Sequence, residues 1–300
     1  MKVLVLTSCR VKESRGNMAN DLIYQEVQGC NERADIFKLP GSKKVDLTKI
    51  LIWGIMIFNV VFITLIILSL FLKSSIGDVI SVVKDLNTLK AIKITISSIF
   101  CSAIMTIIIG VPFAYVMAQK QGKVYRIINM ILNLPLVMPP TVAGLALLMA
   151  FGRRGAFANV IRVFGFDIPF SFVALIIVQV FVMLPLFTQA LRSGFEAINQ
   201  DIKEAAMVFG AGEKELLFLI YLPLSIRAFM TGLIMACLRA AGEFGATMMF
   251  AGNLSGKTQT LSTAIYTLSQ RDLGQSISLA VVLILIFLLP LLVLELKLKE

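Results

Sequence analysis

The 300-residue sequence contains no histidine, and only 15% of its residues are charged. Histidine is the commonest metal ligand and general base in proteins, so its absence argues against a metal centre or an acid–base enzyme. The low charge excludes an ordinary soluble domain, in which about a quarter of the residues are charged. The four cysteines, Cys9, Cys30, Cys101 and Cys237, are far apart, and their spacing indicates neither a metal site nor a disulfide framework.

Hydrophobic residues make up 58% of the chain, and the mean hydropathy is +0.88. After a polar tail, residues 1–47, they gather in six runs, at about 50–72, 91–118, 127–151, 172–191, 226–251 and 277–296. Each run is about 20 residues or longer, which is enough to cross about 30 Å of hydrocarbon as a helix. We therefore predict an all-α, polytopic membrane protein whose membrane domain is residues 48–300, with six transmembrane helices.

The distribution of basic residues predicts the orientation. The short loop after the second run carries Lys120, Lys123 and Arg126 and no acid, so it is expected on the cytoplasmic side. Counting outward places both termini and the loop 196–224 on that side as well. The opposite side then receives the loops 73–90, 152–171 and 252–276. The formal charge of +10 fits cytoplasmic lysine and arginine beside anionic lipid better than a nucleic-acid partner.

The outer loop 152–171 runs against this pattern, because it holds Arg153, Arg154 and Arg162 against a single acid, Asp167. Two interpretations stay open. The arginines are ordinary solvated residues, or they form a basic rim toward an anionic solute.

The stretch AGNLSGKT, residues 251–258, differs by one residue from the phosphate-binding pattern G-x-x-x-x-G-K-[ST]. Such a loop needs a strand before it and a helix that starts at the lysine, so that backbone N–H groups converge on phosphate. Here a membrane helix precedes it, and the loop is predicted on the outer side. We therefore predict that the chain does not bind ATP, that it is not an enzyme, and that Lys257 is a solvated loop residue.

The cytoplasmic loop between the fourth and fifth runs has an amphipathic pattern. Asp201 is positioned to cap a short helix, and Ile202, Ala205, Ala206 and Phe209 share one face of it. Gly210 is expected to end this helix. A helix with small residues on its face can approach a partner closely and fill a groove.

This loop resembles the EAA motif of ATP-binding-cassette importer permeases: Glu-Ala-Ala, three residues, Gly, nine residues, Ile, one residue, Leu-Pro. The matching positions are Glu204, Ala205, Ala206, Gly210, Ile220, Leu222 and Pro223. The resemblance implies the type I importer permease fold. It also implies that the segment forms a coupling helix, which docks into a separate ATPase subunit.

Two further stretches resemble molybdate permeases in particular, and the resemblance extends over about residues 87–296. They are LPLVMPPTVAG (134–144) followed by FGRRG (151–155), and LRAAGEFGAT (238–247) continuing through 250–260 to Ile265 and Tyr266. Sulfate permeases share Gly-Glu-Phe-Gly-Ala but match the following loop less well. The resemblance implies a homodimer in a bacterial or archaeal inner membrane, two ATPase subunits that bind ATP and magnesium, and an extracytoplasmic oxyanion-binding protein.

Two runs carry residues expected at the solute pathway or at a helix interface. Pro135, Pro139 and Pro140 should bend or unwind the third run, and such backbone is tolerated where it lines a cavity or packs against protein. In the fifth run, Arg239 and Glu243 are four residues apart and should form an ion pair. A direct gate or solute role for this pair is the alternative.

Small residues recur at four-residue spacing in the fifth run, at Gly232, Ala236 and Ala240 and again at Ala241 and Gly245. Helices with such residues pack closely in lipid, so we expect a crowded interface here, at the dimer axis and pathway. Among functions, a molybdate importer is favoured over a tungstate or sulfate importer of the same type. The alternative from another class is a secondary transporter or channel that works without an ATPase.

Overall fold

The computed structural model describes residues 47–120, 122–163, 165 and 167–297. The predicted polar tail, residues 1–47, therefore lies outside the described residues except for its last position. The chain divides into two compact units, residues 1–64 and 65–300, and each is described by itself. The described part of the first unit is the beginning of α2 (Leu47–Lys73).

Helix α2 exposes apolar side chains along nearly its whole length. No residue of its span Thr48–Lys73 is buried, and Trp53 and Phe58 are 60% and 68% exposed. In water such a surface would be unfavourable, whereas lipid tails are as apolar as the side chains themselves. Helix α2 is thus long and apolar enough for the first predicted membrane span.

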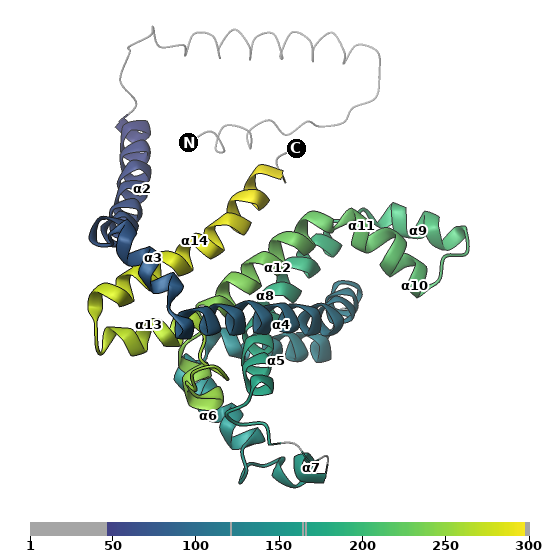
Figure 1. Ribbon diagram of the computed structural model, residues 1–300. Coiled ribbons are helices and arrows are strands. Elements are labelled where there is room, and N and C mark those ends of the chain that lie inside the picture. The colour runs from purple at the N-terminus through teal and green to yellow at the C-terminus, as the bar shows by residue number, and fades with distance from the viewer. Residues whose placement is uncertain (1–46, 121, 164, 166, 298–300) are drawn as a thin grey trace, which may run out of the picture. The chain divides into compact units, whose positions relative to one another are not determined.

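The second unit consists of helices in its described part. In chain order they are α3 (Ile76–Lys84), α4 (Leu86–Gln119), α5 (Lys123–Val137), α6 (Pro140–Phe151), α7 (Ala158–Val163), α8 (Phe172–Glu196), α9 (Gln200–Val208), α10 (Glu213–Glu215), the π-helix η1 (Leu216–Tyr221), α11 (Leu222–Leu224), α12 (Ile226–Ala241), the π-helix η2 (Thr247–Ala251), α13 (Leu261–Ser269) and α14 (Leu273–Lys297). Helices α4, α8 and α12 pack side by side and form the centre of this unit (Figure 1).

Side-chain caps fix where the long helices begin. Asp85 Oδ2 accepts hydrogen bonds from the backbone N–H groups of Asn87 and Thr88, at 3.0 Å each, and so starts α4. Ser171 caps α8 by accepting from Ala174 N. Helix α4 therefore spans residues 86–119, whereas the apolar run predicted 91–118. The prediction started too late because the first turn of α4 contains polar residues, which an apolar run does not include.

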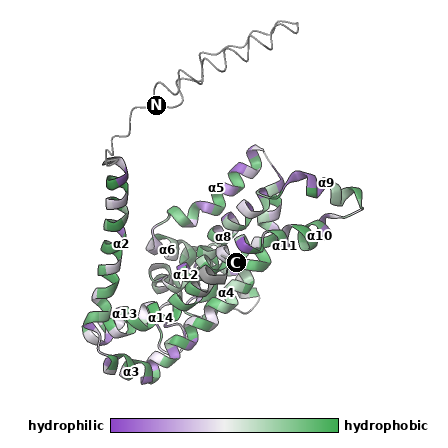
Figure 2. Ribbon diagram, turned by 90° about the horizontal axis from the view of Figure 1, so that it is seen from above, coloured by the Kyte–Doolittle hydropathy of each residue, from purple (hydrophilic) through white to green (hydrophobic). Residues whose placement is uncertain are grey.

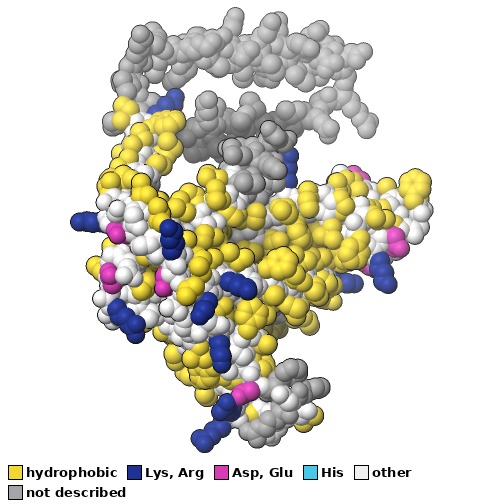
Figure 3. Space-filling view, viewed as in Figure 1, with side chains coloured by type: hydrophobic (Ala, Val, Ile, Leu, Met, Phe, Trp, Pro, Cys, Tyr) yellow, Lys and Arg dark blue, Asp and Glu magenta, His cyan; other side chains and the backbone are white. Residues whose placement is uncertain are grey.

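Apolar side chains cover the surface of the second unit between its two ends. In the space-filling view, charged side chains gather around α3 and α13, around α9 and α10, and beside α7 (Figure 3). The hydropathy colouring likewise shows hydrophobic residues along the long helices and hydrophilic residues at α9 (Figure 2). An apolar band between groups of charged side chains is the surface expected of a protein that spans a bilayer.

In the part of the chain that the structure describes, four helices are long and apolar enough to cross a membrane: α2, α4, α8 and residues 273–290 of α14. Two bent pairs, α5 with α6 and the helices of 213–224 with α12, raise the number to six if each pair is one span. The six predicted spans agree with this upper number.

The third and fifth predicted spans are not continuous helices. Helices α5 and α6 meet at 116°, which confirms the predicted bend, and the break lies at Met138–Pro139 while Pro135 stays inside α5. The fifth span was predicted as one run to residue 251. This is wrong, because α12 ends at Ala241 and helical backbone resumes only at Gly245. Apolar residues lie on both sides of Gly242–Phe244, and this conceals the interruption.

The small residues of α12 pack against α8 of the same chain. A Cβ added at Gly232 would come within 2.7 Å of Ala190 Cβ, and Ala236 and Ala240 are fully or nearly fully buried. The crowded interface predicted for this face therefore exists, but its partner is α8 of this subunit. Close backbone approach is what small residues permit in lipid.

Candidate functional site

The EAA segment, residues 196–224, begins with α9. Asn199 caps this helix, because its Oδ1 accepts from Asp201 N at 3.1 Å. The prediction that Asp201 is the cap is therefore wrong by two residues. Asp201 instead lies in the first turn, where its negative charge is favourable beside the helix N-terminus.

Gly210 ends α9 in a conformation that favours glycine. Its φ is +87°, in the left-handed region. Gly210 N donates to Met207 O at 3.0 Å, and Ala211 N donates to Ala206 O at 3.0 Å. These two bonds make the Schellman motif, which satisfies carbonyls left open at a helix C-terminus. The spacing of Ala206 and Gly210 in the EAA motif thus has a local structural cause.

One side of α9 and the turn after it present apolar residues with no described partner. Val208 and Phe209 are 85% and 90% exposed, and Met207 and Ile202 are exposed as well. Glu204 and Ala205 are also exposed, whereas Ala206 packs on the central core. Helix α9 lies outside the apolar band, at an end of the unit where charged side chains gather (Figure 3). Contact with lipid therefore does not explain why these apolar side chains are exposed.

Two side-chain hydrogen bonds join the EAA segment to the end of α4. Tyr115 Oη donates to Glu213 Oε2 at 2.6 Å, and Lys203 Nζ donates to Gln119 Oε1 at 2.9 Å. Tyr115 also meets Phe195 and Tyr221 edge-on, with ring centroids 6.3 and 5.2 Å away. The segment is thus attached firmly to α4 and α8.

The remaining motif residues belong to the same attachment. Ile220 and Leu222 pack against the core formed by α4, α8 and η1. Pro223 has no N–H to offer a preceding carbonyl, and the chain here is π-helical up to Tyr221. Glu204, Ala205, Ala206, Gly210, Ile220, Leu222 and Pro223 therefore lie in one continuous segment, with Glu204 and Ala205 outward and Ile220 and Leu222 inward.

A second candidate region is the contact between the two helix breaks. Pro139 and Pro140 occupy the turn between α5 and α6, and Gly245 packs on Pro140. A Cβ at Gly245 would lie 2.7 Å from Pro140 Cβ and 3.2 Å from Pro140 C and Thr141 N. The structure thus brings Pro139, Pro140 and Gly245 together. Their contact lies at α6, away from α9 and α10 of the EAA segment (Figure 1). Pro135 is not in this contact.

The predicted pair of Arg239 and Glu243 is present. Arg239 Nη1 donates to Glu243 Oε2 at 2.9 Å, and the Glu243 side chain is only 2% exposed. Its other oxygen, Oε1, accepts from Ala246 N at 3.0 Å, so Glu243 also caps the helical turn that resumes at Gly245. The Arg239 side chain is 43% exposed. The carboxylate thus stabilises the break that it occupies.

Glu243→Ala is expected to destabilise the protein by about 1–3 kcal/mol, since it leaves Ala246 N–H without its partner and removes the acid that pairs with Arg239. Thermal unfolding of the detergent-solubilised protein measures this. Glu243→Gln keeps an acceptor for Ala246 and should be destabilised less. Equal melting of Glu243→Ala and wild type would contradict this role.

The stretch 251–258, which resembles a phosphate-binding loop, uses backbone N–H groups for hydrogen bonds within the loop itself. The N–H groups of Lys257, Thr258 and Gln259 all donate to Leu254 O, at 2.9–3.1 Å. Helix α13 begins at Leu261, after a Thr260 capping box, and not at the lysine. Lys257 N and Thr258 N, two of the backbone donors that a phosphate-binding loop would use, are therefore already bonded within the loop.

The loop 152–171, which holds three arginines, is partly neutralised. Arg153 Nε donates to Asp167 Oδ2 at 3.1 Å, and this hydrogen bond holds the pKa of Asp167 below its ordinary value. The pair is exposed to solvent, so its contribution to stability is small. Arg154 is also exposed, and the Arg162 side chain lies outside the described residues.

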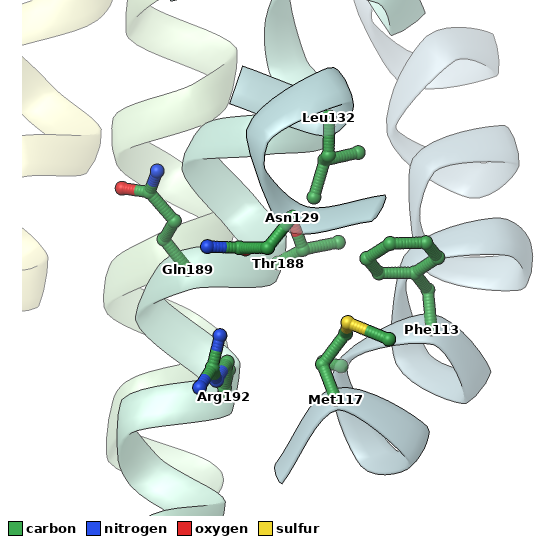
Figure 4. A pocket seen from close by; sticks show the side chains of 8 residues that line it. Phe113, Met117, Asn129, Leu132, Thr188, Gln189 and Arg192 are labelled. Atoms are coloured by element: carbon green, nitrogen blue, oxygen red, sulfur yellow. The ribbon is translucent and has the colours of Figure 1, made fainter. Parts of the chain in front are cut away.

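A polar cluster that sequence reasoning missed lies between α5 and α8. It consists of Asn129, Asn133, Gln189 and Arg192. All of these except Asn133 line a narrow hollow against α4 (Figure 4). The signal was available, because Arg126, Asn129 and Asn133 recur at three- and four-residue spacing within an apolar run. Within the described residues, no group of three acids or cysteines is arranged to hold a metal.

These features define a helical membrane protein with an exposed apolar segment at one end. Comparison with known proteins gives the family. Residues 110–296 match the family described as "Binding-protein-dependent transport system inner membrane component". The chain belongs to this family, and it is a membrane subunit, not the ATPase.

The chain is also similar to individual permeases. It is 34% identical over 235 residues to "Probable transport system permease protein NifC" of Clostridium pasteurianum, covering 78% of this chain and 82% of that protein. It is 33% identical over 196 residues to "Molybdenum transport system permease protein ModB" of Mycobacterium tuberculosis, covering 65% and 74%.

A solved structure shares the fold. The match is to a chain of a bacterial alginate ABC transporter in complex with a periplasmic protein that holds an alginate pentasaccharide. The TM-score is 0.64 at 16% identity, over 81% of this chain and 92% of that one. The architecture is therefore the type I importer permease fold.

Proposed function

We propose that the chain is the permease subunit of an ATP-driven molybdate importer. The observation that carries the proposal is its similarity, at 33% identity over 196 residues, to permeases named for molybdenum transport. Desolvating a dianion costs many kcal/mol, so the oxyanion needs a polar route through the bundle. Two copies of the chain form that route, and residues 48–300 supply its membrane domain.

The EAA segment is the docking site for the ATPase. Its exposed apolar residues, Met207, Val208 and Phe209, suit a groove on a partner protein, and Glu204 beside them supplies a charge. Its hydrogen bonds to α4 pass a displacement of the segment to the long helices. Two ATPase subunits that bind ATP and magnesium would move the two copies between inward-open and outward-open states.

The helix breaks form part of the pathway wall. Pro139, Pro140 and Gly245 bring irregular backbone together, and such backbone within a membrane protein is tolerated in buried contacts or along cavities. Both termini and the EAA segment face the cytoplasm, and a binding protein delivers the oxyanion at the side of α3 and α13.

The test is uptake by vesicles that contain the permease, its ATPase and the loaded binding protein. Labelled molybdate should enter the vesicles only with ATP. Competition by unlabelled tungstate and sulfate measures the selectivity of uptake. Uptake of sulfate in preference to molybdate would replace the proposed substrate. Transport by the permease alone, without ATP, would overturn the proposal in favour of a secondary transporter.

A further inference from the structure

Two polar faces meet where α5 packs against α8. Arg126, Asn129 and Asn133 lie on one face of α5, at spacings of three and four residues. Gln189, Arg192 and Glu196 repeat the same spacing on α8. Gln189 Nε2 donates to Asn133 Oδ1 at 2.5 Å and joins the two faces. Polar residues inside membrane helices are costly, and they usually face the bundle interior or a route for polar solutes.

The hollow beside these faces is polar on one side and apolar on the other. Asn129, Gln189 and Arg192 lie on one side, and Phe113 and Met117 of α4 lie opposite (Figure 4). Asn129 is half-buried and has no hydrogen-bond partner in the described part of the chain. An amide left without a partner beside an arginine is a donor available to a ligand.

The charge of the polar faces favours an anion. They carry two arginines, Arg126 and Arg192, and one acid, Glu196. Arg192 Nε donates to Glu196 Oε1 at 2.7 Å, which offsets the acid and leaves both terminal nitrogens of the guanidinium for other acceptors. Lys120 and Lys123 add positive charge at the start of α5.

The position of the hollow places it at the end of the bundle that carries the EAA segment. It lies beside the last two turns of α4, and Gln119 at the end of that helix accepts the hydrogen bond from Lys203 of α9. Arg192 is one turn before the end of α8, and α9 follows that end directly. The hollow is too narrow in this conformation for a water molecule. A ligand therefore enters only when α5 and α8 separate.

We propose that Asn129, Asn133, Gln189 and Arg192 form a binding site for the translocated tetrahedral oxyanion on the EAA-segment side of the helix breaks. Arg192 and Asn129 donate N–H groups to the anion, and the Asn133–Gln189 hydrogen bond closes the site between transport cycles. The proposal rests on the proposed function and adds the residues that bind the anion before it leaves the permease on the cytoplasmic side.

The experiment compares Arg192→Gln and Asn129→Leu with wild type in vesicles that hold the whole transporter and the loaded binding protein. Loss of a charge-assisted hydrogen bond should lower molybdate uptake about tenfold, while ATP hydrolysis stimulated by the binding protein continues. Arg192→Lys should recover part of the uptake, because it keeps the charge but not the paired donors. Asn59→Leu, the same change at an exposed amide of α2, a helix that contributes no residue to the hollow, is the matched control.

Each outcome decides one point. Wild-type uptake by both Arg192→Gln and Asn129→Leu overturns this inference and leaves the proposed function standing. No uptake by the wild-type transporter overturns the proposed function itself. The headgroup phosphate of an anionic lipid offers the same chemistry, so the assay is repeated in vesicles of phosphatidylcholine alone, in which the choline cation balances each phosphate. A defect seen only with anionic lipid would mean a lipid site and would overturn the inference.

Discussion

Gly210→Val is expected to lower ATP-dependent uptake by about 5–30-fold while the protein still reaches the membrane. Gly210 has a φ of +87°, and a left-handed backbone costs other residues about 1–2 kcal/mol, more when the side chain is β-branched. A change of that size shifts a conformational population by a factor of about 5–30. The turn after α9 would be remodelled, together with the exposed residues Val208 and Phe209 that we assign to ATPase docking.

Uptake and co-purification of the ATPase measure this effect side by side. Gly54→Val is the matched control, since a Cβ at Gly54 meets nothing within 4 Å and the residue lies in α2. Glu204→Arg tests the same surface without backbone strain, because Glu204 is exposed and its reversal leaves the fold intact. Normal ATPase binding and uptake in both Gly210→Val and Glu204→Arg would rule out docking at this segment.

Gly245→Val is expected to destabilise the fold by about 1–3 kcal/mol or more through overpacking. Its Cβ would meet Pro140 Cβ at 2.7 Å and the backbone of Pro140 and Thr141 at 3.2 Å. Backbone atoms cannot rotate away as a flexible side chain can, so α6 itself would have to move. The amount of protein in the membrane and the melting temperature after solubilisation should both fall.

The control for this change lies three residues earlier in the chain. A Cβ at Gly242 would come no closer than 3.8 Å to the Arg239 carbonyl oxygen, and its φ of −86° suits any residue. Gly242→Ala should therefore keep nearly wild-type stability. If Gly245→Val and Gly242→Ala melt alike, the contact between the helix breaks does not determine stability.

The prolines show that local sequence alone does not determine where a helix ends. Pro112, Pro135 and Pro185 lie inside α4, α5 and α8, and none of them ends its helix. The adjacent residues Pro139 and Pro140 do interrupt the helix. Two backbone N–H groups are lost there, and each proline disfavours helical backbone at the residue before it. The bend was thus predictable, but its angle of 116° was not.

The fifth span shows the opposite case, in which the sequence concealed a break. Gly242, Glu243 and Phe244 interrupt an apolar run that reads as one helix. The interruption is stable because Glu243 meets both Arg239 and Ala246 N, and because Ser262 Oγ donates to Glu243 O at 2.9 Å. The spacing predicted the ion pair. The contact with Ser262 comes from the first turn of α13, 19 residues away, and has no local signature.

The sequence by itself determined the helical membrane architecture and the EAA segment, because lipid allows few backbone solutions and the motif has fixed spacing. It also predicted the turn at Gly210. Only the tertiary structure decided that the small residues of α12 pack against α8, that Gly245 fits onto Pro140, and that the polar faces of α5 and α8 meet. These contacts depend on how helices distant in sequence are positioned in three dimensions, which hydropathy and residue spacing do not encode.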